Sequence, residues 1–139
     1  LESRVYPHVG MEKEKVFDNE HMRFEDHGDI VHVWYKEGTV TLEIAKSIVS
    51  KRKEFTDNKP VKVLVKQSGL KGIKREARAY LSSDEGVENI VGAAIMMENP
   101  FQRHLANFFL GITVIRPKVP TRLFNDQEEA VQWLRSLKV

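Results

Sequence analysis

FNDQEEAVQWL, residues 124–134, best defines the fold, because it ends a strand and at once begins a helix. Asn125 is predicted to be the N-cap, its side-chain oxygen accepting from an amide of the first turn, and Glu128 can complete a capping box. The acidic residues of this turn place negative charge at the positive end of the helix dipole. The apolar residues that then share one helical face are Ala130, Trp133, Leu134 and Leu137. The segment therefore predicts a helix that packs directly against the strand before it.

The same alternation of strands and helices extends upstream. Two strands, His21–Asp26 and Asp29–Lys36, are joined at His27-Gly28, where glycine permits a tight turn. The second strand is apolar on both faces, which is typical of a central strand. The later elements are a helix over Thr41–Phe55, a strand over Val61–Lys66, a helix over Lys74–Ser82, a helical turn from Ser83 or Asp84 through Ile90, a strand over Val91–Met97, a helix over Phe101–Ile112 and a strand over Pro117–Phe124.

This order predicts the α/β class. Parallel strands separated by helices require right-handed crossovers, so we expect a mixed, mostly parallel sheet of about five strands with an N-terminal hairpin and about four to five helices. The chain of 139 residues is long enough for one domain with its own core. We expect residues 13–139 to form that domain. Residues 1–12 are predicted to be a leader or an added tail without stable structure, with Met11 as the natural start.

Composition excludes several classes of function. The chain has no cysteine, which excludes disulfides, thiolate catalysis and cysteine zinc sites, and fits a reducing cytoplasm. The formal net charge of +2 is too small to indicate nucleic-acid binding. No apolar run approaches the roughly 20 residues that cross a bilayer. We therefore expect a cytoplasmic protein, peripheral to the membrane if it binds lipid.

The order of elements resembles the STAS/SpoIIAA-like fold over about residues 13–139. The segments that support the resemblance are the closing strand with Glu129–Leu134, Val63-Leu64-Val65 followed by Ser68–Ile73 and Glu76–Leu81, and Ala106–Leu110. The resemblance implies a small bacterial SpoIIAA-like domain. It points toward membrane association or apolar-ligand binding near the Phe101–Ile112 helix. Because its motifs are mainly structural, they are more specific for fold than for activity.

A phosphorylation switch is one property of the wider family that this chain does not match. The anti-sigma antagonists of that family have a phosphorylatable serine in an Asp-Ser-Ser-Gly-like turn, which opens the helix after the third strand. The matching stretch here, Gly72–Glu76, has no hydroxyl group. Ser68 lies a few residues earlier, where a serine in a β-turn is the ordinary interpretation and a phospho-switch is the alternative.

Basic residues gather around the loop that contains Ser68, between the strand Val61–Lys66 and the helix Lys74–Ser82. They are Lys66, Lys71, Lys74, Arg75 and Arg78. Open α/β sheets bind ligands where strands lead into helices, so one interpretation is a small anion site or a contact with an acidic partner or lipid headgroup. The other interpretation is a solvated basic face. Cations at a helix start are unfavourable unless an anion offsets them, which is in favour of function.

The predicted helix Phe101–Ile112 has a wide apolar stripe, and Leu110 lies opposite its centre, near Arg103. Beside Phe109 at the edge of the stripe, Leu110 would form an apolar patch for a second subunit, a lipid surface or a hydrophobic ligand. Ordinary core packing with one exposed leucine is the alternative.

No set of residues has the specificity of a catalytic signature. His21, His27 and His32 lie near Asp29, but their spacing matches no metal motif, so we expect no metal, no cofactor and a half-buried His32. The chain has neither a nucleophile elbow, nor a P-loop, nor a dinucleotide-binding glycine motif.

We therefore predict a non-enzymatic binding or regulatory module, either a homodimer or a partner-binding monomer. It would contact an anionic or amphiphilic ligand, a membrane surface or a protein partner, and no nucleic acid. The predicted contact residues are Lys66, Ser68, Lys71, Lys74, Arg75, Arg78, Arg103, Phe109 and Leu110. One alternative is a small-molecule enzyme that uses Glu76, Tyr80 or His104 for proton transfer. Another is a purely structural homo-oligomer.

Overall fold

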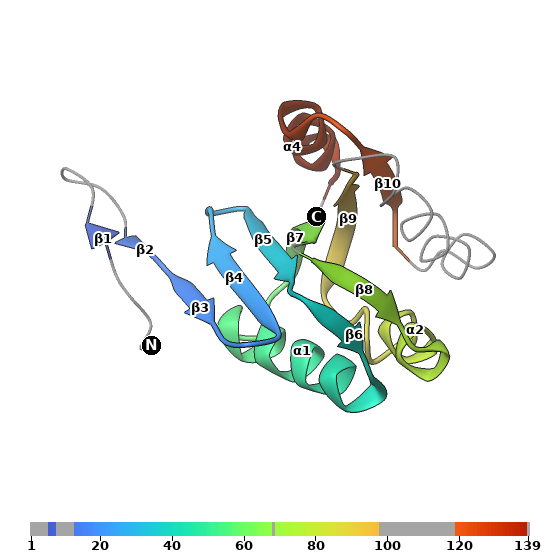
Figure 1. The fold of residues 1–139 in the computed structure, drawn as a ribbon. Helices are drawn as coiled ribbons and strands as arrows, with labels where there is room; N and C mark the ends of the chain where they lie inside the picture. The colour runs from blue at the N-terminus through green and yellow to red at the C-terminus, as the bar shows by residue number, and fades with distance from the viewer. Residues whose placement is uncertain (1–5, 8–12, 68, 98–118, 139) are drawn as a thin grey trace.

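A six-stranded sheet with strand order β10-β9-β7-β5-β4-β3 forms the centre of the domain (Figure 1). The computed structural model describes residues 6–7, 13–67, 69–97 and 119–138. The strands of the sheet are β3 (Val16–Asp18), β4 (Met22–Asp26), β5 (Ile30–Tyr35), β7 (Val61–Gln67), β9 (Ile90–Met96) and β10 (Thr121–Phe124). The last four are mutually parallel, whereas β3 and β4 are antiparallel to their neighbours. The predicted mixed, mostly parallel sheet is confirmed.

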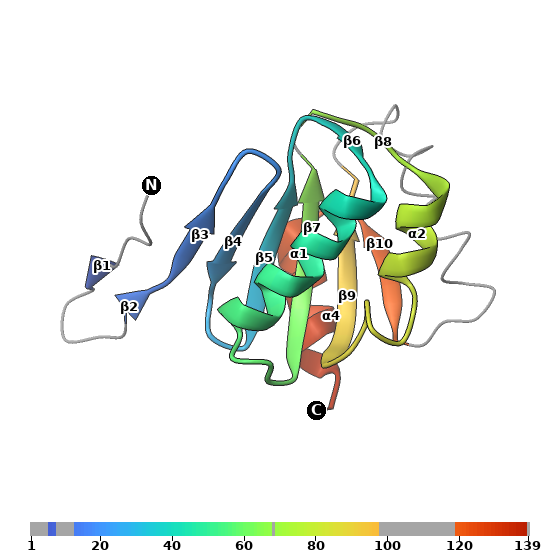
Figure 2. The ribbon, with the colours of Figure 1, turned by 90° about the horizontal axis from the view of Figure 1, so that it is seen from below.

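Helices cover both faces of this sheet. Figure 2 shows α1 (Leu42–Phe55) and α2 (Arg75–Leu81) on one face and α4 (Gln127–Ser136) on the other. The alternation of side chains along a strand divides the core accordingly. Val63 packs with residues on the α1 side, whereas Leu64 packs with Ala130 and Leu134 of α4. Strand β5 therefore has apolar residues on both faces, as its sequence predicts, and β7 buries Leu64 on the face opposite Val63.

The pairing of β7 with β9 is the central contact of the sheet. Leu64 lies opposite Ala94, and Val65 lies opposite Ile95, in a parallel register. Leu64 has 0% exposed surface and Ile95 has 1%. Two strongly apolar segments of the sequence are thus neighbouring buried strands, as the resemblance to a SpoIIAA-like fold requires.

Short strands add structure that the sequence analysis did not predict. Strand β6 (Gly38–Val40) pairs in parallel with β8 (Leu70–Ile73) in a separate two-stranded sheet, and β1 (Tyr6–Pro7) pairs with β2 (Lys13–Glu14). Gly38 and Gly69 have φ values of 108° and 75°, which other residues rarely adopt. Strand β3 also extends the central sheet beyond the five predicted strands. The sequence analysis placed only a loop between β7 and α2. This prediction is wrong, because β8 lies there.

The predicted helical turn from Ser83 or Asp84 through Ile90 is found in part. The Val87 amide donates to the Ser83 carbonyl at 3.0 Å, as in one turn of an α-helix, but the segment continues as a series of turns and Ile90 begins β9. The Ser83 hydroxyl accepts from the Gly86 amide at 3.1 Å, as the side chain of an N-cap residue does. Asn89 has φ +64°, in the left-handed region. The described residues contain three of the predicted helices. The predicted Phe101–Ile112 helix and most of the predicted leader lie outside the described residues.

The N-cap of α4 is Asp126 rather than the predicted Asn125. The Asp126 carboxylate accepts from the Glu128 amide at 2.8 Å and from the Glu129 amide at 3.2 Å. A charged acceptor at this position also gains from the helix dipole, which a neutral asparagine does not. Ala130 and Leu134 still face the sheet, so the shift by one residue leaves the predicted packing unchanged.

Replacing Asp126 with alanine is expected to lower the free energy of unfolding by about 1 kcal/mol, the usual value of an N-cap. Replacing Asn125 with alanine is the matched control, and its effect should be close to zero. Urea unfolding followed by circular dichroism measures both variants. A larger effect at Asn125 than at Asp126 would contradict the assignment of the cap.

Candidate functional site

The structure does not bring the predicted basic residues together at one place. Lys66 projects from the face of β7 that α4 covers, because it alternates with Val65, and its Nζ lies 4.6 Å from the centre of the Trp34 ring. Helix α2 covers the opposite face. Lys71, Lys74 and Arg75 lie exposed on β8 and at the start of this helix.

The topology also removes a reason for expecting an anion site there. Strands β5, β7, β9 and β10 are neighbours in chain order, so the strand order does not reverse within the parallel part of the sheet. Ligand crevices in open α/β sheets form where such a reversal occurs. Lys74 is the N-cap of α2 without a side-chain cap bond, and Arg78 donates from Nη1 to the Ile73 carbonyl at 2.8 Å. A binding role for these residues stays a prediction.

The remaining predicted residues are only partly described. Ser68, Arg103, His104, Phe109 and Leu110 lie outside the described residues, so their proposed roles stay predictions. Glu76 is exposed on α2.

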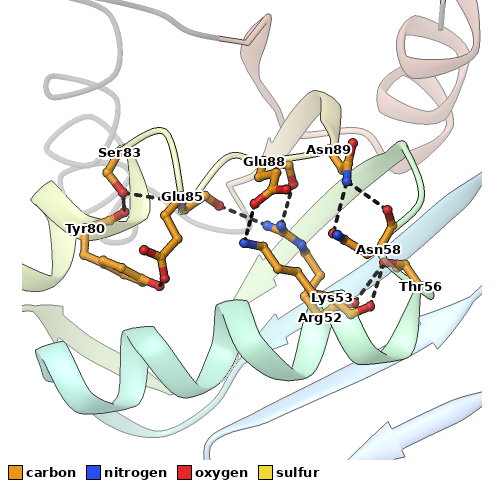
Figure 3. Close-up of polar contacts among 10 residues, drawn as sticks. Arg52, Lys53, Thr56, Asn58, Tyr80, Ser83, Glu85, Glu88 and Asn89 are labelled. Carbon is orange, nitrogen blue, oxygen red and sulfur yellow. Dashed lines mark hydrogen bonds and ion pairs between the residues drawn. The ribbon is translucent and has the colours of Figure 1, made fainter.

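Tyr80 is the described candidate for proton transfer that has a specific partner. Its hydroxyl donates to Glu85 Oε2 at 2.6 Å (Figure 3). Burial, followed by this hydrogen bond, raises the pKa of Tyr80 to about 12. The phenol is therefore protonated near neutral pH. The enzyme hypothesis stays a prediction.

An apolar cavity of about 80 Å³ lies between the sheet and α1, where the sequence analysis placed only core packing. Its walls come from β4, β5, β7, β9, α1, the end of α2 with the turns that follow it, and the start of β10. Most lining side chains are aliphatic, among them Val33, Ile48, Val63, Val65, Leu81 and Ile95. Tyr35 and Arg52 are polar members of the same wall.

Arg52 is a charged residue almost completely removed from solvent. It has 5% exposed surface, and it donates from Nη1 to the Gly86 carbonyl at 3.0 Å and from Nη2 to the Glu88 carbonyl at 2.7 Å (Figure 3). Burial lowers the pKa of Arg52 from its usual value, but a guanidinium stays charged near neutral pH. Tyr35 is also buried, and burial raises the pKa of its phenol to about 12. The cavity wall thus contains a cation and a neutral phenol.

Further polar contacts fasten the turns after α2 to the end of α1. Lys53 Nζ lies 2.7 Å from Glu88 Oε1, and Asn89 Nδ2 donates to the Asn58 carbonyl at 2.8 Å (Figure 3). We name residues 83–89 with these contacts the α1 clamp. The clamp places Gly86 and Val87 in the cavity wall.

A signal for Arg52 was present in the sequence. The buried face of α1 contains Ala45, Ile48, Val49 and Phe55, and Arg52 lies between them at helical spacing. A charged residue inside an apolar stripe predicts a buried charge. Nothing local in the sequence identifies its acceptors, which lie 34 and 36 positions away.

Three aromatic rings with polar groups lie together on the sheet face opposite α1. The rings of His27 and His32 stack with centroids 3.8 Å apart, and Trp34 lies 6.0 Å from His32. His32 is 5% exposed, so it is fully rather than half buried. Burial, followed by the nearby charges of His27 and Lys66, lowers the pKa of His32 to about 4.

The described residues contain no group of three or more metal-ligating side chains that could hold an ion. None of the helices in the described ranges is long and apolar enough to cross a bilayer.

These features define a class: an α/β domain with a SpoIIAA-like fold and a small internal cavity. A solved structure of an uncharacterised DUF3478-family protein from Shewanella loihica PV-4, described as having a SpoIIAA-like fold, is similar with a TM-score of 0.57 and 17% sequence identity. The similarity covers 85% of this chain and 97% of that chain, and at this identity it establishes the fold alone. The predicted SpoIIAA-like fold is confirmed.

The chain belongs to the family described as "Domain of unknown function (DUF7793)", whose sequence model matches residues 22–138. No curated protein matches the chain in sequence.

Proposed function

We propose that this domain is a non-enzymatic binding module that takes a small, largely apolar molecule into the cavity beneath α1. The observation that supports the proposal is a mainly aliphatic cavity lined by the sheet, α1 and the α1 clamp. Ligand pockets are typically apolar concavities with few polar groups. A cavity of about 150 Å³ admits benzene in another protein. At about 80 Å³, the cavity described here accommodates a few heavy atoms without rearrangement.

Contacts with a membrane surface, a protein partner or a second copy of the chain are alternatives from the sequence analysis. They concern mainly the predicted helix that lies outside the described residues. A liposome co-sedimentation assay with anionic and neutral vesicles distinguishes them from cavity binding, because a cavity ligand does not require a lipid surface.

Titration with cyclopropane, an apolar probe of three carbon atoms, followed by two-dimensional amide NMR, is expected to shift the resonances of Val33, Val63 and Ile95, which line the cavity. Val65→Ile adds a methyl group to the wall and should weaken binding about three-fold or more, because interiors are close-packed. Val31→Ile is the control, since Val31 is buried in the same core but does not line this cavity. Shifts absent in the unmodified protein, or equal binding by both variants, would refute the proposal.

A further inference from the structure

Arg52 is the part of the cavity wall that an apolar ligand does not explain. We infer that Arg52 is the anion-binding residue of this cavity, and that the ligand is a short monocarboxylic acid. Its carboxylate would lie on the guanidinium and its hydrocarbon chain against the aliphatic wall. The inference rests on the proposed function, because it specifies which ligand the cavity takes.

Within the described ranges, Arg52 has no opposite charge in direct contact, although the more distant Glu88 carboxylate partly offsets the lowering of its pKa by burial. Among the described residues, no carboxylate oxygen lies within 4.0 Å of the Arg52 guanidinium, and its acceptors are neutral backbone carbonyls. The Glu88 backbone carbonyl accepts from Arg52, while the Glu88 carboxylate is paired with Lys53 Nζ at 2.7 Å. A buried charge is costly unless an opposite charge and hydrogen bonds compensate it. A ligand anion would supply that opposite charge.

The guanidinium of Arg52 also has hydrogen-bond donors left for a ligand. The described residues accept hydrogen bonds from Nη1 and Nη2 only, so the planar fork of Arg52 retains donors for another acceptor. Arginine pairs with carboxylates in a planar, often bidentate geometry, and such charge-assisted bonds are stronger than neutral ones.

The volume of the cavity limits the length of the ligand's hydrocarbon chain. If the carboxylate contacts Arg52, the cavity of about 80 Å³ has to hold only the hydrocarbon part of the ligand. This volume suits a chain of about three carbon atoms, since about 150 Å³ suits the six of benzene. Butyrate is therefore a suitable probe, and butyramide is its neutral counterpart of nearly the same shape.

The experiment compares butyrate and butyramide by NMR titration of the full chain. The unmodified protein should bind butyrate about ten-fold more tightly than butyramide, as expected for a charge-assisted pair. Arg52→Gln should reduce this ratio to about one, whereas Arg52→Lys should retain part of it. Lys51→Gln removes one charge from an exposed position of the same helix, and it should leave the ratio unchanged. A merely structural Arg52 would weaken both ligands equally, leaving the ratio intact.

The outcomes separate this inference from the proposed function. Equal binding of butyrate and butyramide by the unmodified protein would overturn the inference and leave cavity binding intact. Binding of cyclopropane without binding of butyrate would do the same. Failure of all three probes would overturn the proposed function as well. If Arg52→Gln does not fold, the Arg52 side-chain Nε resonance of the unmodified protein still decides, because it should shift with butyrate and not with butyramide.

Discussion

Replacing Gly86 with alanine is expected to lower the free energy of unfolding by about 3 kcal/mol or more. A Cβ atom at Gly86 would lie 2.2 Å from the Tyr80 carbonyl oxygen and 2.7 Å from that of Leu81. Both are backbone atoms at the end of α2, so no side-chain rotation relieves the overlap. Either α2 or the α1 clamp therefore has to move. A movement of the clamp would also displace the Gly86 carbonyl, which accepts from Arg52.

Gly72→Ala is the matched control, because a Cβ at Gly72 would meet no heavy atom within 4 Å. Its effect should remain within about 1 kcal/mol. Urea unfolding, monitored by tryptophan fluorescence, gives both free energies. Similar values for the two variants would mean that Gly86 tolerates a side chain, and that the close packing of the clamp against α2 is incorrect.

Local periodicity was sufficient for the elements buried on both sides. The alternation in β7 and the continuous apolar run in β9 predicted two strands, and the structure pairs Leu64 with Ala94 in the centre of the sheet. The helical spacing of Ala45 and Ile48 likewise predicted α1. Such patterns are reliable because burial of a whole face or stripe determines which residues can be apolar.

The features that sequence reasoning missed depend on contacts between distant segments. Strands β6 and β8 are short, and each is stabilised by the other across about thirty positions. The basic residues between positions 66 and 78 appeared as one cluster because they are neighbours in the chain. The two-residue period of a strand and the position of α2 instead place Lys66 on the opposite face of the sheet.

The candidate site also depends on contacts between distant segments, which the sequence does not reveal. The composition of the α1 stripe reveals that Arg52 is a charge among apolar residues. It does not reveal that Gly86 and Glu88 supply only neutral oxygens to it, because that depends on the turns after α2. The fold was therefore predictable from pattern, whereas the cavity and its cation were not.

Acidification is expected to destabilise the domain through His32. Burial, together with the charges of His27 and Lys66, lowers the pKa of His32 from 6.5 to about 4, and the opposing charge of Glu25 only partly offsets this. In the unfolded chain His32 binds a proton near its usual pKa, so below that pH the unfolded state binds more protons than the folded state. The contribution of His32 to stability is complete above about pH 6.5 and is lost as the pH falls toward 4. The loss amounts to about 2.5 kcal/mol between neutral pH and about pH 4.5.

The variant His32→Phe isolates this contribution, because it keeps an aromatic ring against His27 and Trp34 but has no titrating group. Free energies of unfolding are measured from pH 7 to about 4.5 for the unmodified chain and the variant. The pH dependence of the variant should be weaker by about 2.5 kcal/mol over this range. His21→Gln, at a half-exposed histidine, is the control for loss of an imidazole outside the stacked group. Two carboxyl groups, those of Asp18 and Glu25, also have lowered pKa values, because the effect of burial is outweighed by their partners Lys36, Arg23 and His27. Their contribution to stability is lost at still lower pH in both proteins, so it cancels in the comparison. Parallel curves for His32→Phe and the unmodified chain would show that His32 gains its proton as readily in the folded state as in the unfolded one, and that the stacked pair with His27 is open to water.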